Sequence, residues 1–341
     1  MRKLLNTLYV TIPHAYLSKD GETVLVQVER ETRLRVPIHT LEGIVCIGLV
    51  SMSPALMGFC AEHNVGVSYL SEHGRFLARI QGKIHGNVLL RREQYRRADD
   101  DDASAAIARS ILLAKVANSR TSMLRSARER ASTSLDAACV QLGQSLRLLE
   151  PEPSDSLESL RGVEGDAAKT YFSVFDEMIL HQKEDFYFRE RSRRPPLDSV
   201  NALLSFLYVL LAHDVASALE AVGLDPAVGF LHRDRPGRAS LALDLMEELR
   251  PVLADRLALS LINRRQVGAA GFSRSDSGGV TMNDATRKEV LVAWQLRKQE
   301  EILHPFLNER IPFGLVPHAQ ALLLARYLRG DMDSYPSYFW R

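Results

Sequence analysis

Cysteine is scarce in this sequence, and its scarcity excludes two kinds of stabilised fold. The 341 residues contain three cysteines: Cys46, Cys60 and Cys139. Their low and odd number and their wide spacing argue against a disulfide framework and against a zinc site built on thiolates. We therefore expect a cytoplasmic location, where thiols stay reduced.

A long apolar run is also missing. No stretch reaches the roughly 18 uninterrupted apolar residues of a membrane span, so we expect no membrane insertion. The opening MRKLLNTLYVTIP is basic and then apolar, but it alternates like a strand and no small-residue cleavage site follows, which argues against a signal peptide. With 46% hydrophobic and 25% charged residues, the composition is typical of a globular chain whose length allows two domains.

An excess of positive charge is missing as well, since the formal net charge is +1. Net charge alone therefore gives no reason to expect nucleic-acid binding. Arginines nevertheless gather in two places, 91–97 and 189–194, and four aspartates form the run 99–102. A local basic surface is what phosphate binding requires. The alternative for each cluster is an ordinary solvated helix face.

Period-two alternation dominates residues 1–90 and predicts a β-rich region. The turn Lys-Asp-Gly precedes the second predicted strand. One helix is expected among the strands, with Ser53 as its N-cap and Pro54 at its first position. The helix covers 55–62, and the predicted strands are 8–12, 23–28, 34–36, 44–47, 66–70 and 75–80.

Helical periodicity takes over after residue 90. Helices are predicted within 103–149 and at 162–175, 200–221, 241–248, 252–263, 286–306 and 318–328, with 271–284 as a loop or short hairpin. The predicted fold class is therefore α+β. It has a small β-sheet-rich N-terminal domain (1–90), a linker (91–102) and a larger all-α domain (103–341).

Glu164 is the first residue that suggests chemistry. It stands in RGVEGDAA, and Ala168, Tyr171 and Phe175 follow at positions that share its helix face. Its carboxylate then lies on the inward side of an apolar helix, where burial is costly without a partner or a metal. The alternative is an acid in the first turn of a helix, where it favours the positive end of the dipole.

His232 and the pair Asp244 and Glu247 are the other candidates. His232 follows GFL, where a hydrogen-bonded core or loop histidine is the ordinary alternative. Asp244 and Glu247 are three residues apart in SLALDLMEE and hence neighbours on a helix, and the alternative is the polar edge of an amphipathic helix. Carboxylates with one imidazole are a ligand set for Mg²⁺ or Mn²⁺. Spacing alone does not show that the three segments converge.

The order of these motifs resembles the CRISPR-associated adaptation integrase, the nuclease subunit of spacer acquisition. The likeness covers nearly the whole chain and is greatest to the subtype I-C branch. It implies a β-sheet N-terminal domain and a helical catalytic C-terminal domain. The resemblance rests on the segments RGVEGDAAKTYF, DSVNALLSFLYVLLAHDVASALEAVGLDPAVGFLH, GRASLALDLMEELRP, LLNTLYVTIPHAYLSKDGETVLVQVE and GGVTMNDATRKEV.

The resemblance implies roles for the acids and the histidine. Glu164, His232 and Glu247 match the residues that hold a divalent metal, Mg²⁺ or Mn²⁺, in the family. Asp244 matches a supporting acid one turn earlier, and the choice between Asp244 and Glu247 as the direct ligand stays open. All four residues are therefore expected to be catalytic.

The resemblance also implies positions for basic and polar residues. Arg238 matches a basic residue near the scissile phosphate. Asn201 and Tyr208 match recurrent positions on the preceding helix, where packing and capping are the alternatives. We expect further phosphate contacts, which fix register without identifying bases, from Arg189, Arg191, Arg193 and Arg194.

The activity implied by the resemblance is that of a metal-dependent DNA endonuclease and integrase in antiviral defence. Attack by a DNA 3′-OH on a phosphodiester would insert short fragments as new spacers into a CRISPR array, and attack by water would cleave DNA. The implied partners are double-stranded DNA, a second copy of the chain and a small second CRISPR-associated adaptation protein. The alternative is a non-catalytic DNA-binding scaffold with a β-rich dimerisation module, which has little use for acids set among leucines.

Overall fold

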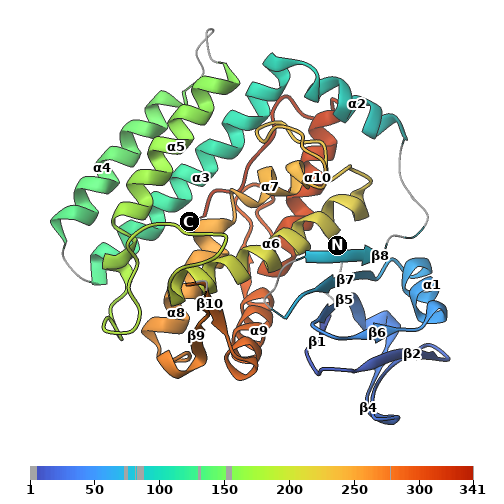
Figure 1. The fold of residues 1–341 in the computed structure, drawn as a ribbon. Coiled ribbons are helices and arrows are strands. Elements are labelled where there is room, and N and C mark those ends of the chain that lie inside the picture. The colour runs from blue at the N-terminus through green and yellow to red at the C-terminus, as the bar shows by residue number, and fades with distance from the viewer. Residues whose placement is uncertain are drawn as a thin grey trace.

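A β-rich N-terminal part lies beside a larger helical part in the computed structural model of the chain (Figure 1). Helix α6 (Ser199–Val222) runs through the middle of the helical part. The predicted order, sheet before helices, is confirmed. The structure describes residues 6–72, 76–80, 82, 88–129, 132–150, 156–276 and 278–340.

Two four-stranded sheets and helix α1 make up the N-terminal part. One has the strand order β1-β5-β7-β8 and is parallel except for its last pair, and the other has the order β4-β3-β2-β6. Residues of both sheets, such as Leu17 and Ile44, form one buried apolar cluster with α1. The elements are β1 (Asn6–Val10), β2 (Tyr16–Asp20), β3 (Thr23–Val28), β4 (Glu31–Pro37), η1 (Ile38–Thr40), β5 (Leu41–Ile47), β6 (Ser51–Met52), α1 (Pro54–Glu62), β7 (Gly66–Leu70) and β8 (Phe76–Ile80).

Most of the alternating segments are strands, as the sequence predicts. The ranges 23–28 and 66–70 match β3 and β7 residue for residue. Ser53 caps α1 by accepting a hydrogen bond from Leu56 N at 3.2 Å. The sequence did not predict β2, because YLSKD has one buried residue among partly or fully exposed ones. Position 75 of the predicted strand 75–80 lies outside the described residues.

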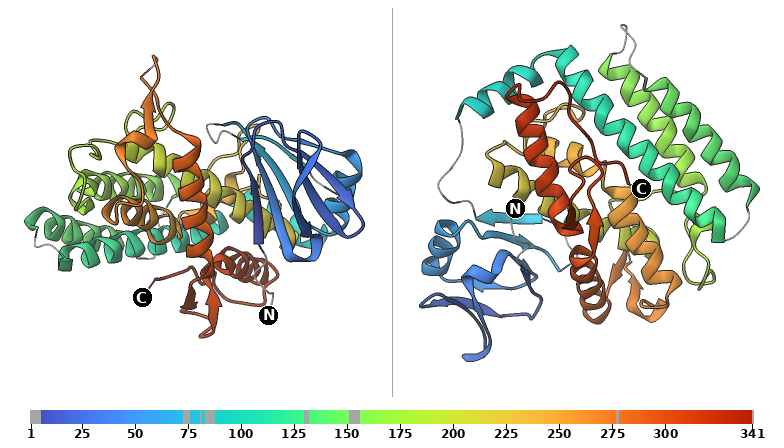
Figure 2. Two further views of the ribbon diagram at one scale, coloured as in Figure 1. Left: turned by 90° about the horizontal axis from the view of Figure 1, so that it is seen from below. Right: turned by 180° about the vertical axis from the view of Figure 1, so that it is seen from behind.

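The helical part packs its elements in layers. Helices α3, α4 and α5 lie side by side, and α6 contacts α7, α8 and α10 behind them (Figures 1 and 2). The elements are α2 (Val88–Ala98), α3 (Asp101–Glu129), α4 (Thr133–Leu148), α5 (Leu157–Ser173), η2 (Phe175–Met178), α7 (Ser240–Met246), the π-helical turn η3 (Arg250–Asp255), α8 (Arg256–Asn263), η4 (Ala269–Gly271), β9 (Phe272–Arg274), β10 (Val280–Met282), α9 (Asp284–Gln299), β11 (Glu301–Leu303), β12 (Arg310–Pro312), η5 (Phe313–Leu315) and α10 (Val316–Leu328).

The expectation of an all-α second domain is wrong in detail. Two short antiparallel hairpins, β9–β10 and β11–β12, stand among the helices. The first lies where the sequence allowed a loop or hairpin. The second replaces the end of the helix predicted at 286–306, because the backbone turns extended at Glu300 (φ −60°, ψ 130°) and α9 ends there.

The stretch predicted as a linker, 91–102, is mostly helical. Helix α2 continues to Ala98, and the break falls at 99–100. There Asp100 Oδ1 accepts hydrogen bonds from the backbone N–H groups of Asp102 and Ala103, both at 3.0 Å, and so caps α3. The four aspartates thus start a helix, a position where acids favour the helix dipole.

The two parts of the chain are joined through α6. His213 Nδ1 lies 2.9 Å from Ser68 Oγ on β7, and Arg79 on β8 forms an ion pair with Glu220 at 2.8 Å. By length and composition α6 is apolar enough to cross a membrane, but 61% of its apolar window is buried inside the structure. Its apolar character is that of a core helix, which holds the N-terminal sheet against the remaining helices.

Candidate metal centre

Glu164 lies in the interior of α5 and not at its start. Helix α5 begins at Leu157, where Ser156 Oγ accepts a hydrogen bond from Ser159 N at 3.2 Å. Glu164 is therefore two turns inside the helix, and the alternative of an acid in the first turn is wrong. Its helix face continues with Ala168 and Tyr171, and these side chains line a small cavity of about 50 Å³ together with Glu164.

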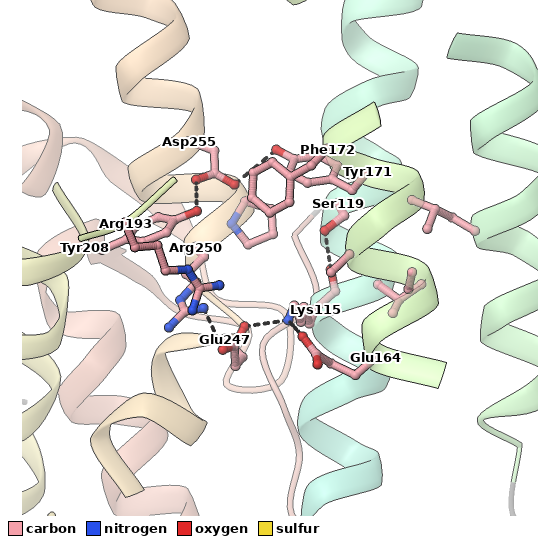
Figure 3. A pocket seen from close by; sticks show the side chains of 15 residues that line it. Lys115, Ser119, Glu164, Tyr171, Phe172, Arg193, Tyr208, Glu247, Arg250 and Asp255 are labelled. Carbon is pink, nitrogen blue, oxygen red and sulfur yellow. Dashed lines mark hydrogen bonds and ion pairs between the residues drawn. The ribbon is translucent and has the colours of Figure 1, made fainter. Parts of the chain in front are cut away.

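Lys115 on α3 reaches into the same cavity and binds two carboxylates at once. Its ammonium forms an ion pair with Glu164 and lies 2.8 Å from Glu247 Oε2 (Figure 3). Burial lowers the pKa of Lys115, but the two carboxylates outweigh burial and hold that pKa above its usual value. Lys115 therefore stays protonated, and its ammonium lies between two acids, Glu164 on α5 and Glu247 at the end of α7.

Glu247 is the most enclosed acid of this group. Its side chain is 3% exposed, and Arg250 binds Oε1 at 2.7 Å. Burial raises the pKa of Glu247, but Arg250 and Lys115 outweigh it and bring the pKa to about 2. Glu247 is thus a buried carboxylate that stays ionised, which is possible only because cations surround it.

The wall of the cavity opposite Glu164 is a second polar cluster built on Asp255. Tyr208 donates its hydroxyl to Asp255 Oδ1 at 2.7 Å, and Tyr171 donates to Oδ2 at 3.1 Å. Burial raises the pKa of Asp255 to about 6. Asp255 ends the π-helical turn η3, which begins at Arg250, so this turn presents two polar residues to the cavity. Such turns are rare and often lie at functional sites.

Asp244 is fully buried, and both of its carboxylate oxygens accept hydrogen bonds from the loop that carries His232. Its Oδ2 accepts hydrogen bonds from the N–H groups of Phe230 (2.6 Å) and Leu231 (2.9 Å). Its Oδ1 accepts from His232 N at 3.0 Å and lies 2.6 Å from His232 Nδ1. Because a carboxylate only accepts, Nδ1 carries the proton and His232 Nε2 keeps its lone pair. An imidazole held this way is the usual arrangement for a metal ligand.

The loop reaches Asp244 because position 229 has no side chain. A Cβ at Gly229 would lie 2.7 Å from Asp244 Oδ2 and 2.8 Å from the backbone carbon of Ser240. His232 itself faces a different hollow of about 510 Å³, lined also by Arg161 and Arg233.

The residues present suit a divalent cation in part. Glu164 and Glu247 converge on one positive charge, and the buried Glu247 Oε2 has no hydrogen-bond partner other than Lys115 among the described residues. Carboxylate oxygens of this kind are the ligands that Mg²⁺ and Mn²⁺ prefer. Within the part of the chain that the structure describes, however, no three histidine, cysteine or acidic side chains are grouped closely enough to hold a metal. The carboxylate pair is assembled, and His232 stands apart from it.

The four arginines at 189–194 do not share one role. Arg191 donates to Asn201 Oδ1 at 2.6 Å and to Ser205 Oγ at 3.2 Å, so it fastens the loop to α6. Asn201 also donates to Glu190 O at 2.8 Å, which is the capping and packing role that the sequence left open. The exposed side chains Arg189, Arg193 and Arg194 remain for phosphate contact, and of these Arg193 lines the cavity.

Three residues of this centre escaped the sequence analysis. Arg250 follows Glu247 by three positions, a spacing that favours an ion pair on a helix, so it could have been found. Asp255 lies four positions after Pro251, without a pattern to mark it. Lys115 occurs in SILLAKVANSR, where a lysine is ordinary.

Together these features define a class of protein: a β-rich part joined to a helical part that holds buried carboxylates around a cation. Comparison with known proteins agrees with this class. Residues 8–296 match the family described as "CRISPR associated protein Cas1". The chain is 53% identical over 345 aligned positions, covering all of both chains, to a protein of Chlorobaculum tepidum named CRISPR-associated endonuclease Cas1 1.

Two solved structures show the same fold. One is titled "Casposase bound to integration product" (TM-score 0.85, 21% identity), with 99% of this chain and 95% of that chain covered. The other, from a "Cas6-RT-Cas1--Cas2 complex" (TM-score 0.82, 22% identity), has 99% of this chain covered but only 36% of that longer chain. The chain belongs to the CRISPR associated protein Cas1 family, and it is an enzyme of the nuclease and integrase class.

Proposed function

We propose that this chain is a divalent-metal-dependent DNA endonuclease and integrase that inserts short DNA fragments as new spacers into a CRISPR array. The observation that carries the proposal is the convergence of Glu164 and the buried Glu247 on one cation. A scaffold gains nothing from a buried, ionised carboxylate such as Glu247, whose charge must be balanced. The alternative of a non-catalytic DNA-binding scaffold is therefore not favoured.

In this proposal Glu164, Glu247 and the Nε2 atom of His232 hold Mg²⁺ or Mn²⁺. When bound, the metal supplies Lewis-acid stabilisation of the charge that develops on the phosphodiester. Asp244 positions the imidazole by accepting its Nδ1 proton at 2.6 Å. The direct third ligand is then Glu247 and not Asp244, because Asp244 is saturated by the loop at 230–232.

Basic side chains would position the DNA. The exposed Arg193 lines the cavity beside Glu247, and Arg189, Arg194 and Arg238 are partly or fully exposed. Guanidinium groups bind phosphates without identifying bases. A 3′-OH delivered to the bound phosphodiester would give joining, and water in the same place would give cleavage.

The assembly that we propose is a homodimer formed through the N-terminal β part, approximately 1–90, acting on double-stranded DNA with a small second CRISPR-associated adaptation protein. The division before α2 and the membership of the subtype I-C branch belong to this proposal, as does the cytoplasmic location. Support for the partners comes from the family and from the titles of the two solved structures. Among the described residues, the helix that is long and apolar enough to cross a membrane is α6, and 61% of its apolar window is buried inside the structure.

The test compares Glu164→Ala with Asp166→Ala, a matched control on the same helix whose side chain is exposed. Joining of short duplexes to a repeat-bearing plasmid is measured, together with affinity for the same DNA. Glu164→Ala should abolish joining and cleavage but keep nearly the same DNA affinity, because it removes an acid and no cationic contact. Full activity of Glu164→Ala with Mg²⁺ or Mn²⁺ present would contradict the proposal.

A further inference from the structure

The position of Lys115 has a consequence for cation binding at this centre. Lys115 Nζ lies between the two carboxylates that the proposed function assigns to the metal, in contact with Glu164 and 2.8 Å from Glu247 Oε2. Its side chain is 13% exposed, so the ammonium is an enclosed member of the centre. A surface lysine resting on an acid would be far more exposed.

Glu247 Oε2 is held by Lys115 alone. It lies 2.8 Å from the ammonium and has no other hydrogen-bond partner among the described residues. The other oxygen of Glu247 is already taken by Arg250 at 2.7 Å. Oε2 is the atom of Glu247 that remains for an incoming cation.

The four side chains that pair directly with one another are balanced in charge as they stand. Glu164 and Glu247 carry two negative charges, and Lys115 and Arg250 carry two positive ones. A divalent cation added to this set would leave two surplus positive charges in an enclosed place, where charge is costly. A divalent ion coordinates carboxylate oxygens at roughly 2.0–2.6 Å, so it and the ammonium cannot share the space between the same two groups.

We infer that Lys115 is the resident counter-ion of the Glu164–Glu247 pair and that a divalent cation binds only by displacing it. Lysine suits this role, because its ammonium is a point charge on a flexible stem. Arg250 binds the other oxygen of Glu247 and stays in place. This inference rests on the proposed function, and it adds that metal loading competes with a side chain of the protein itself.

The displacement lowers the apparent affinity for the metal. When a competent state is populated only in part, the observed dissociation constant is larger by the inverse of that fraction. If Lys115 occupies the pair about nine-tenths of the time, its removal should tighten binding about tenfold. Without a metal, the same removal should destabilise the fold, since the buried Glu247 and the half-buried Glu164 lose their shared cation.

The first experiment measures Mn²⁺ binding to the metal-free full chain by calorimetry, without DNA. Lys115→Met, which keeps an unbranched stem without charge, should bind Mn²⁺ at least about tenfold more tightly than the wild type. Lys115→Arg, which keeps the charge, should bind no more tightly than the wild type. Thermal melting should show that Mn²⁺ raises the melting temperature of Lys115→Met by more than that of the wild type.

A second measurement uses the unaltered protein and so does not depend on a variant that folds. An amine-reactive acetylating reagent is applied with and without Mn²⁺, and modification of each lysine is quantified by mass spectrometry. Modification of Lys115 should rise when Mn²⁺ binds, because the ammonium leaves the carboxylates. Lys183, which pairs with Asp176 at 2.8 Å in an exposed place, serves as the control and should not change.

The possible results separate the inference from the proposed function. If Mn²⁺ binds the wild type but Lys115 modification is unchanged, or if a folded Lys115→Met binds Mn²⁺ equally or more weakly, the displacement idea is wrong while the metal site stands. If neither the wild type nor Lys115→Met binds Mn²⁺, the metal site and the proposed function fail together with it. Glu164→Ala should lose Mn²⁺ binding in every background.

Discussion

Asp244→Asn should weaken both the fold and the proposed metal site, because one carboxylate accepts from four N–H groups. Its two oxygens accept from the backbone N–H groups of Phe230, Leu231 and His232 and from His232 Nδ1, at 2.6–3.0 Å. The substitution replaces one accepting oxygen by an NH₂ group that can only donate. The side chain is buried, so water cannot replace the lost acceptor.

The amide has two possible orientations, and each has a distinct cost. With its NH₂ toward Phe230 and Leu231, two buried N–H groups lose their acceptor, at about 1–3 kcal/mol each. With its NH₂ toward His232, one backbone N–H loses its acceptor, and the imidazole must move its proton to Nε2 so that Nδ1 can accept. The second orientation costs about 1–3 kcal/mol of stability, and it removes the lone pair that a metal needs.

The second orientation should prevail because it leaves fewer unsatisfied groups. We therefore expect Asp244→Asn to lose about 1–3 kcal/mol in urea denaturation and about 10- to 100-fold in Mn²⁺ affinity. Asp234→Asn is the matched control, since Asp234 lies two residues after His232 and is exposed. It should leave both quantities unchanged. An Asp244→Asn protein with wild-type stability and wild-type Mn²⁺ affinity would refute the role given to Asp244.

Three further outcomes follow from other contacts. Gly229→Ala should lower the thermal stability by about 1–3 kcal/mol, because its Cβ would lie 2.8 Å from the backbone of Ser240; wild-type melting would contradict the close approach. Burial lowers the pKa of His213 to about 4, so wild-type stability should fall as the pH drops from about 6.5 to about 4, and His213→Gln should flatten that window in urea denaturation. Each phosphate contact that is removed should reduce the slope of log DNA affinity against log salt concentration by about 0.9. Alanine replacements at Arg189, Arg193 and Arg194 test this.

The strands and helices follow closely from local pattern, because each needs only neighbouring residues. Alternation finds β3 and β7, and Ser53 with Pro54 finds the start of α1. The sequence missed features that depend on distant contacts. Helix α9 stops at Gln299, with Glu300 as its C-cap, and the β11–β12 hairpin begins at Glu301; the nearest proline, Pro305, lies six residues beyond that stop.

The acids of the centre could be found from sequence because a carboxylate among apolar residues is anomalous within its own segment. Glu164, on an apolar helix face, and Asp244, among leucines, meet that test, and Glu247 is reached by its spacing of three residues from Asp244. The structure places Glu164 and Glu247 around one cation. The resemblance to the family supplied the same residues independently. His232 was also proposed, and the structure shows its imidazole held by Asp244, the acceptor that a metal-binding histidine requires.

The different roles of Asp244 and Glu247 depend on which neighbouring element each side chain points toward, and a sequence does not give that. Three residues along a helix of 3.6 residues per turn differ by about 60° in direction, so the two acids are neighbours that face different walls. The loop at 229–232 lies against one wall and takes all of Asp244. Helix α3 lies against the other, and its Lys115 meets Glu247.

Lys115 could not have been chosen from sequence for a related reason. Its two partners lie 49 and 132 positions away in the chain, and a long lysine stem allows the ammonium to reach solvent from almost any helix position. Burial of this lysine follows only from the packing of α3 against α5 and α7. Two acids of the centre, Glu164 and Glu247, are therefore found from sequence, whereas Lys115 and the third acid, Asp255, are assigned by the fold.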